Sequence, residues 1–386
     1  MKRIRNYSIS GSKYFILGFI FLVTVIITFI SMKFEQIMPS ATTMADATLP
    51  TVAMDTEAGT QYNVLHGYTS ELDSTLLYGN ITPVAKDRKL TVTINTYGED
   101  IEGVAYKIRS LEDKSLIENT EVSDYGNAGS RIQVTLNIRN LLDTGKEYAL
   151  EVVLKTKKHE AVYYYTRIVY GVDYDLQKKL DFVMDFNACT FDDSRLKDIS
   201  GYLETSSSGD NTNYGKVNIN CSLSQVGWGD LDPYVESDII PEVISVDDDV
   251  AILRLSYRVG AANDYSSSDT YTVSEYYRIR QTNSGFYLLN FEREMNQVFD
   301  ARNDLTSTAK INLGINSSTD VNCASDEKGI YTYFVNQGSL WCFNSSSQTF
   351  TRVFSFKGEE TDSVREGYDA HNIKIMKIED NGDATF

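Results

Sequence analysis

The hydrophobic residues of this chain change their spacing along its length. Tyr14 to Met32 form one uncharged apolar run, whereas from about Gln61 the apolar residues alternate with polar ones. Alternation with period two is typical of half-buried β-strands. Five such stretches follow one another, at residues 90–94, 104–108, 132–138, 148–154 and 162–168. They predict a β-sandwich over residues 61–172.

The spacing becomes helical after Tyr174. Leu176, Leu180 and Val183 recur on one face of a predicted helix, and a start signal for a second helix follows at residues 192–194. Alternating strands then return at residues 251–259, 276–280 and 286–291, the last two about a turn at 282–285. Two helices followed by an antiparallel sheet predict an α+β domain over residues 173–307, with a cystatin-like or a nuclear-transport-factor-like shape as alternatives.

Short strands follow in the last part of the chain, at residues 330–335, 340–343, 350–354 and 373–378. They predict a propeller-like β-meander over residues 308–386. A propeller needs about four or more blades to close, which is more than this segment supplies. We therefore expect that the meander is truncated, so that residues 310–386 either begin a longer native chain or are poorly ordered in isolation, with an unpaired sheet edge.

The apolar run of nineteen residues follows Lys2, Arg3, Arg5 and Lys13. At about 1.5 Å per residue, a helix of this length spans the roughly 30 Å hydrocarbon core of a bilayer. The basic residues predict a cytoplasmic tail at residues 1–13, a transmembrane anchor at 14–32 and an extracellular remainder, beginning with a tether at 33–60. The alternative is a cleaved signal peptide, with a cleavage tract at residues 40–45.

Composition narrows the possible partners. The 386 residues contain 54 acidic and 36 basic side chains, a net charge of −18, which argues against nucleic acid because binding it requires neutralisation of phosphates. The three histidines and four cysteines are widely separated and form no C-x-x-C pattern. We expect no metal and no cofactor, and we interpret the cysteines as free thiols.

The chain has little sign of catalytic chemistry. Ser194 and Lys197 match the S-x-x-K nucleophile motif of penicillin-recognising enzymes, but the S-D-N and K-T-G partner motifs are missing. A helix cap explains Ser194 as well. The sequence also lacks G-x-S-x-G, phosphate-loop and H-E-x-x-H patterns, so we predict no catalytic residue.

One group of basic residues stands out on the predicted strands at 251–259 and 276–280. Its four members alternate with apolar residues and are therefore expected on one sheet face: Arg254, Arg258, Arg278 and Arg280. Guanidinium groups match carboxylates and phosphates, so this face is a candidate site for an anionic glycan, a lipid headgroup or a carboxylate-bearing partner. The alternative is a solvated face on which the arginines form ion pairs with Glu275, Glu292 or Glu294.

Three resemblances add to this picture. Residues 142–152, with Tyr148 at the corner position, resemble the E–F corner and F strand of fibronectin type III and related immunoglobulin-like domains. Residues 338–354 resemble the strand hairpins of extracellular β-propellers. The whole order of segments resembles that of uncharacterised single-pass surface proteins of Gram-positive clostridia. That resemblance implies an architecture and carries no catalytic residues.

Together these features predict a membrane-anchored extracellular interaction or scaffold protein of the bacterial cell surface. Its partner would be a surface glycan or a protein. The alternative is a carbohydrate- or cell-wall-directed enzyme or binding protein, and a weaker one is a sensor or accessory subunit.

Overall fold

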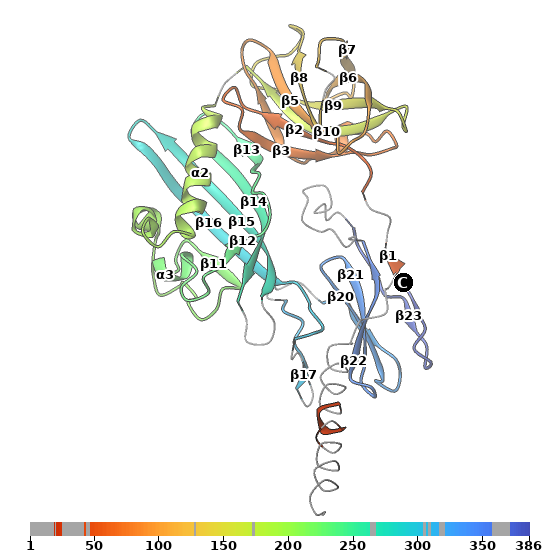
Figure 1. Cartoon of the computed structure of the whole chain (residues 1–386). Helices are drawn as coiled ribbons and strands as arrows, with labels where there is room; N and C mark the ends of the chain where they lie inside the picture. The colour runs from red at the N-terminus through yellow and green to blue at the C-terminus, as the bar shows by residue number, and fades with distance from the viewer. Residues whose placement is uncertain are drawn as a thin grey trace, which may run out of the picture.

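The computed structural model describes residues 47–126, 129–171, 174–262, 268–303, 310–315, 321–356 and 371–386, together with 19, 21–24, 42–43 and 306–307. Along the chain, a two-sheet sandwich is followed by a helix-covered sheet and then by a meander of short strands (Figure 1). This confirms the predicted class, mainly β with several domains.

Most of the predictions for the amino-terminal segment concern residues that the structure does not describe. The predicted tail at 1–13 and most of the predicted anchor at 14–32 lie outside the described residues. Within the ranges given above, no helix combines the length and the apolar character needed to cross a membrane.

The predicted tether at 33–60 is wrong in its last part. Strand β2 (Thr51–Asp55) lies inside one sheet of the sandwich, between β3 (Gln61–His66) and β5 (Lys89–Asn95). All five residues of β2 are buried. A strand that is covered on both faces has no alternation of polar and apolar residues, so its sequence did not resemble a strand.

The sandwich pairs a four-stranded sheet with a five-stranded one. The first has the order β3, β2, β5 and β8 (Arg131–Asn137). The second has the order β4 (Ile81–Val84), β10 (Val162–Tyr170), β9 (Glu147–Thr156), β6 (Ile101–Ser110) and β7 (Leu116–Val122). Only β4 and β10 pair in parallel within these two sheets. A short 3-10 helix, η1 (Ser74–Leu76), follows β3.

Tyr148 fixes the entry to β9. Its buried side chain accepts a hydrogen bond from the backbone N–H of Asp143, at 2.9 Å. Replacing Tyr148 with Phe leaves that N–H without its partner, so we expect a loss of about 1 kcal/mol in the free energy of unfolding, measured by urea denaturation. Tyr287→Phe, on an exposed tyrosine, is the control and should change stability by less than about 0.5 kcal/mol. Equal losses in the two variants would contradict the assignment.

His66, at the end of β3, makes the stability of the sandwich depend on pH. Burial lowers the pKa of His66 to about 4, from an ordinary value of 6.5. As the pH falls below 6.5 the unfolded chain takes up this proton before the folded chain does, so folding becomes less stable until the pH reaches about 4. We expect His66→Gln to flatten the dependence of the urea midpoint on pH between 7 and 4. Parallel curves for the variant and the wild type would show that another group is responsible.

The second domain is a sheet covered on one face by helix α2 (Leu176–Thr190), as Figure 1 shows. The sheet has the order β11 (Lys216–Asn218), β16 (Gly285–Gln297), β15 (Asp269–Thr282), β14 (Val250–Ala261) and β12 (Tyr234–Val235), and β13 (Glu242–Val246) also pairs with β14. The predicted hairpin is present as β15 and β16. The predicted second helix is a 3-10 helix, η2 (Leu196–Tyr202), and a short helix α3 (Leu223–Val226) follows β11.

A buried lysine attaches α2 to the sheet. The Lys179 side chain is fully buried, and its ammonium donates to the carbonyl oxygens of Tyr174, Asp247 and Asp248 at 2.7, 2.6 and 3.0 Å. The three carbonyls satisfy all the donors of the ammonium, which a buried charge requires. The acidic turn at 247–249 thus contributes its backbone to the attachment of α2.

The sandwich and the α+β domain share one continuous core. At their junction Asn63, on β3, is fully buried with a φ of 49°. Its N–H donates to the carbonyl of Pro241, and its Oδ1 accepts from the N–H of Val243, at 2.9 and 2.7 Å. Its Nδ2 donates to the carbonyl of Ile81 at 2.9 Å. One side chain therefore connects β3 and β4 of the sandwich with β13 of the second domain.

The C-terminal meander consists of β19 (Cys323–Ser325), β20 (Tyr331–Asn336), β21 (Ser339–Asn344) and β22 (Thr349–Ser355). Two short hairpins lie beside it in sequence, β17 (Thr306–Ser307) with β18 (Lys310–Ile311), and β23 (Lys377–Ile378) with β24 (Ala384–Thr385). The free edge predicted for the meander is covered in part at β22, where β1 (Thr42–Thr43) pairs in parallel. Small apolar clusters around Phe299 and around Ile373 cover its two faces.

Candidate functional site

The structure brings the four predicted arginines to one face of the α+β sheet. In the register of β14 and β15, Arg254 lies opposite Tyr276, Arg258 opposite Thr272, Ile252 opposite Arg278 and Val250 opposite Arg280. Opposed residues of an antiparallel pair share a face, and residues two apart on one strand do as well. Their alternates, such as Leu253 and Tyr277, are buried beneath α2. The arginines therefore occupy the face turned away from the helix.

The prediction of which glutamates form ion pairs with these arginines is wrong. Arg254 forms its ion pair with Glu242 of β13 and Arg258 with Glu236 after β12, both at 3.7 Å. The sequence did not show that β12 and β13 lie beside β14, so these acids were not considered.

The three predicted acids have other surroundings. Glu275 is fully buried on the opposite face, under α2. Glu294 pairs with Lys216 at 3.7 Å, and Glu292 accepts a hydrogen bond from Asn290 at 3.2 Å. The carboxylates of the exposed face are therefore engaged by groups other than Arg278 and Arg280.

Arg278 and Arg280 are exposed, and neither has an ion-pair or hydrogen-bond partner among the described residues. Across the β15–β16 pair, Arg278 lies opposite Asn290 and Arg280 opposite Tyr287, whose side chain is 54% exposed. A register shift between Arg278 and Ile279 brings Tyr287 and Asn290 to the same face. The two free guanidiniums thus lie beside an exposed aromatic ring and an amide, in a protein of net charge −18.

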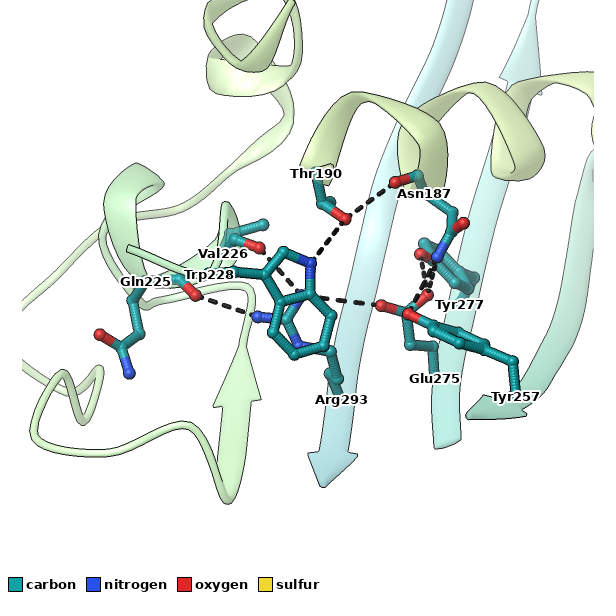
Figure 2. Close-up of polar contacts among 9 residues, drawn as sticks. All are labelled: Asn187, Thr190, Gln225, Val226, Trp228, Tyr257, Glu275, Tyr277 and Arg293. Atoms are coloured by element: carbon teal, nitrogen blue, oxygen red, sulfur yellow. Dashed lines mark hydrogen bonds and ion pairs between the residues drawn. The ribbon is translucent and has the colours of Figure 1, made fainter. Parts of the chain in front are cut away.

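A buried polar cluster lies on the other face of the same sheet (Figure 2). The fully buried Arg293 guanidinium stacks over the ring of Trp228, 3.4 Å from its centroid, and donates to the carbonyls of Val226 and Gln225 at 2.9 and 3.0 Å. Its Nη1 is 3.8 Å from Oε1 of Glu275, which is also fully buried. The end of α3 is thereby attached to β15 and β16.

Hydrogen bonds extend this cluster to helix α2 and to two tyrosines. Glu275 Oε2 accepts from Tyr277 Oη at 2.6 Å and from Asn187 Nδ2 at 2.8 Å. Asn187 also donates to Tyr257 Oη at 3.1 Å, and Trp228 Nε1 donates to Thr190 Oγ1 at 3.2 Å. Burial, with the charge of Glu275 adding to it, raises the pKa of both tyrosines well above its usual range. Burial lowers the pKa of Arg293, and the negative charge of Glu275 acts in the opposite direction.

We interpret this cluster as structural, because every member is enclosed in the core. The sequence contained a signal for it that was missed. Glu275 and Arg293 occupy the apolar phase of their strands, between Val273 and Tyr277 and between Phe291 and Met295. A charged residue in that phase is expected to be buried and paired.

The sandwich has a polar groove at its edge. It encloses about 360 Å³ between the end of β7, the loop that follows it and β8. Nine of its lining residues carry polar side chains: Tyr106, Thr120, Glu121, Ser123, Asp124, Tyr125, Gln133, Thr135 and Asn137. The groove is remote in sequence from the arginine face and offers hydroxyl, amide and carboxylate groups.

The other predicted motifs acquire structural roles. Ser194 donates through Oγ and N–H to Asp192 Oδ1, at 2.6 and 2.9 Å, in the turn before η2, so the helix cap expected from it is replaced by this turn. The cysteines are free thiols, and Cys189, Cys221 and Cys342 are buried. Over the described ranges, no three His, Cys, Asp or Glu side chains gather in a way that could hold a metal ion.

A scan of protein-family models and a search of curated proteins each found no match. The geometry of the chain itself is therefore the basis for its proposed function.

Proposed function

We propose that this protein is a non-catalytic interaction protein that binds an anionic partner on the arginine face of its α+β sheet. The proposal rests on the exposure of Arg278 and Arg280 and on their lack of partners among the described residues. Both are exposed and form no ion pair or hydrogen bond with any residue that the structure describes, while Glu236, Glu242 and Glu294 pair with other cations. An unpaired fork of guanidinium donors favours a planar carboxylate or a phosphate.

The two arginines also lie close to each other on their strand. Residues two apart on one strand lie roughly 7 Å from each other on the same face, so the two positive charges repel. Both strand neighbours of β15 oppose them with uncharged side chains, which are Val250, Ile252, Tyr287 and Asn290. A bound anion relieves this repulsion without displacing an existing ion pair.

The architecture forms part of the same proposal. We propose that residues 14–32 anchor the chain in the cell membrane, with the remaining domains outside the cell as a surface scaffold. The hydrogen bond from Asp143 to Tyr148 supports a fibronectin type III-like origin of the sandwich, because such domains use a corner tyrosine in this way. The antiparallel meander β19–β22 is compatible with a propeller blade.

The test is retention of the purified full chain on immobilised poly-L-glutamate. We expect the double variant Arg278→Gln/Arg280→Gln to bind about tenfold more weakly than the wild type. Lys89→Gln/Arg131→Gln removes the same charge from exposed sites on the sandwich and should bind as the wild type does. At about 0.15 M salt the Debye length is about 8 Å, so repulsion from distant acidic residues is screened more than contacts in the site. Equal losses in the two double variants would overturn the proposal.

A further inference from the structure

The surroundings of Arg278 and Arg280 narrow the class of the anionic ligand. β15 is paired on one side with β14 and on the other with β16, so its backbone groups are used within the sheet. A peptide strand therefore cannot be added at this place, and a ligand meets side chains only. Among those side chains is Tyr287, a large exposed ring directly opposite Arg280.

The groups on this face match the chemical parts of an acidic sugar, which are its ring, its hydroxyls and its carboxylate. The face of a tyrosine ring carries negative charge density and attracts the polarised C–H groups of a sugar ring. Asn290 donates its Nδ2 proton to Glu292, which leaves its carbonyl Oδ1 as an acceptor for a hydroxyl. Each of the two guanidiniums can take a carboxylate through paired N–H donors.

We infer that the face formed by Arg278, Arg280, Tyr287 and Asn290 binds an acidic polysaccharide built from uronic acid residues. The guanidiniums hold the carboxylates, Tyr287 stacks on a sugar ring, and Asn290 accepts a hydrogen bond from a hydroxyl. This inference rests on the proposed anion-binding function and specifies its ligand. An acidic peptide or an anionic lipid surface would use the arginines but would not need the ring of Tyr287.

The experiment measures binding of the full chain to four probes at about 0.15 M salt. These are polygalacturonate, poly-L-glutamate, dextran, and vesicles of phosphatidylglycerol with phosphatidylcholine. The variants are Arg278→Gln/Arg280→Gln, Tyr287→Ala and Tyr287→Phe, with Lys89→Gln/Arg131→Gln as the control. All the changed side chains are exposed, and an unchanged midpoint of thermal unfolding will confirm that each variant is folded.

We expect polygalacturonate to bind about tenfold more tightly than poly-L-glutamate, and the arginine double variant to weaken both about tenfold. Tyr287→Ala should weaken polygalacturonate about fivefold and leave poly-L-glutamate unchanged, whereas Tyr287→Phe, which keeps the ring, should bind as the wild type does. Dextran and vesicles should not bind.

The contrary outcomes are distinct. Equal binding of both polymers with no effect of Tyr287→Ala would overturn the polysaccharide inference and leave the proposed anion-binding function standing. Binding to vesicles alone would replace the polysaccharide by a lipid surface. Polygalacturonate binding that is insensitive to the arginine variant, or no binding of any anionic probe, would overturn both proposals. Dextran binding would place a sugar site elsewhere, with the groove beside β8 as the first place to search.

Discussion

Replacing Arg293 with Leu is expected to lower the free energy of unfolding by about 3–5 kcal/mol. The substitution leaves Glu275 as an uncompensated charge in a fully enclosed site. It also removes the donors that satisfy the carbonyls of Gln225 and Val226, and the stacking contact with Trp228. Urea denaturation followed by tryptophan fluorescence measures the effect, because Trp228 is one of only two tryptophans in the chain.

Two further variants separate loss of charge from loss of volume. Arg278→Leu makes the same chemical change at an exposed position of the neighbouring strand and should cost less than about 0.5 kcal/mol. Adding Glu275→Gln to Arg293→Leu removes the stranded charge, so the double variant should regain at least about 1 kcal/mol relative to Arg293→Leu alone. If Glu275→Gln instead adds a further loss to the Arg293→Leu protein, the charge of Glu275 is not what makes Arg293 necessary.

Replacing Asn63 with Ala is expected to cost about 2–4 kcal/mol, since it strands a buried N–H at Val243 and a buried carbonyl at Ile81. The loss should be concentrated at the junction of the two domains. Hydrogen exchange measured by mass spectrometry should show faster exchange in peptides that contain β13 and β4, while β20 and β21 keep their protection.

The backbone of Asn63 provides an internal control. Its φ of 49° lies in the left-handed region, which costs alanine about 1 kcal/mol or more but costs glycine little. Asn63→Gly removes the same hydrogen bonds without that strain, so it should be about 1 kcal/mol more stable than Asn63→Ala. Unchanged exchange at β13 in both variants would mean that the shared apolar core alone holds the domains together.

The sequence predicted what depends on local spacing and failed where partners are distant. Alternation located β5, β6, β14 and β15, and the phase of the two last strands correctly placed the four arginines on one face. It could not identify the partners of Arg254 and Arg258, since these depend on how β12 and β13 pair with β14.

Other features were not predicted from the sequence, and the reasons are again physical. β2 shows no alternation because it is buried on both faces. The contact between Asn63 and Val243 joins residues 180 positions apart, and the spacing of residues along the chain contains no information on such a contact. The charges of Glu275 and Arg293 were visible in the sequence, but only strand phase and burial together show that they meet.

The parallel pairing of β1 with β22 has a consequence for the order of folding. Thr42 and Phe354 are joined across most of the chain, and a ribosome adds roughly 5–20 residues per second. Thr42 is therefore synthesised about a quarter of a minute to a minute before its partner exists. The sandwich and the α+β domain, whose strands pair among themselves, have time to fold in that interval. The attachment of β1 is thus a late event, and it can take place only after β22 has been made.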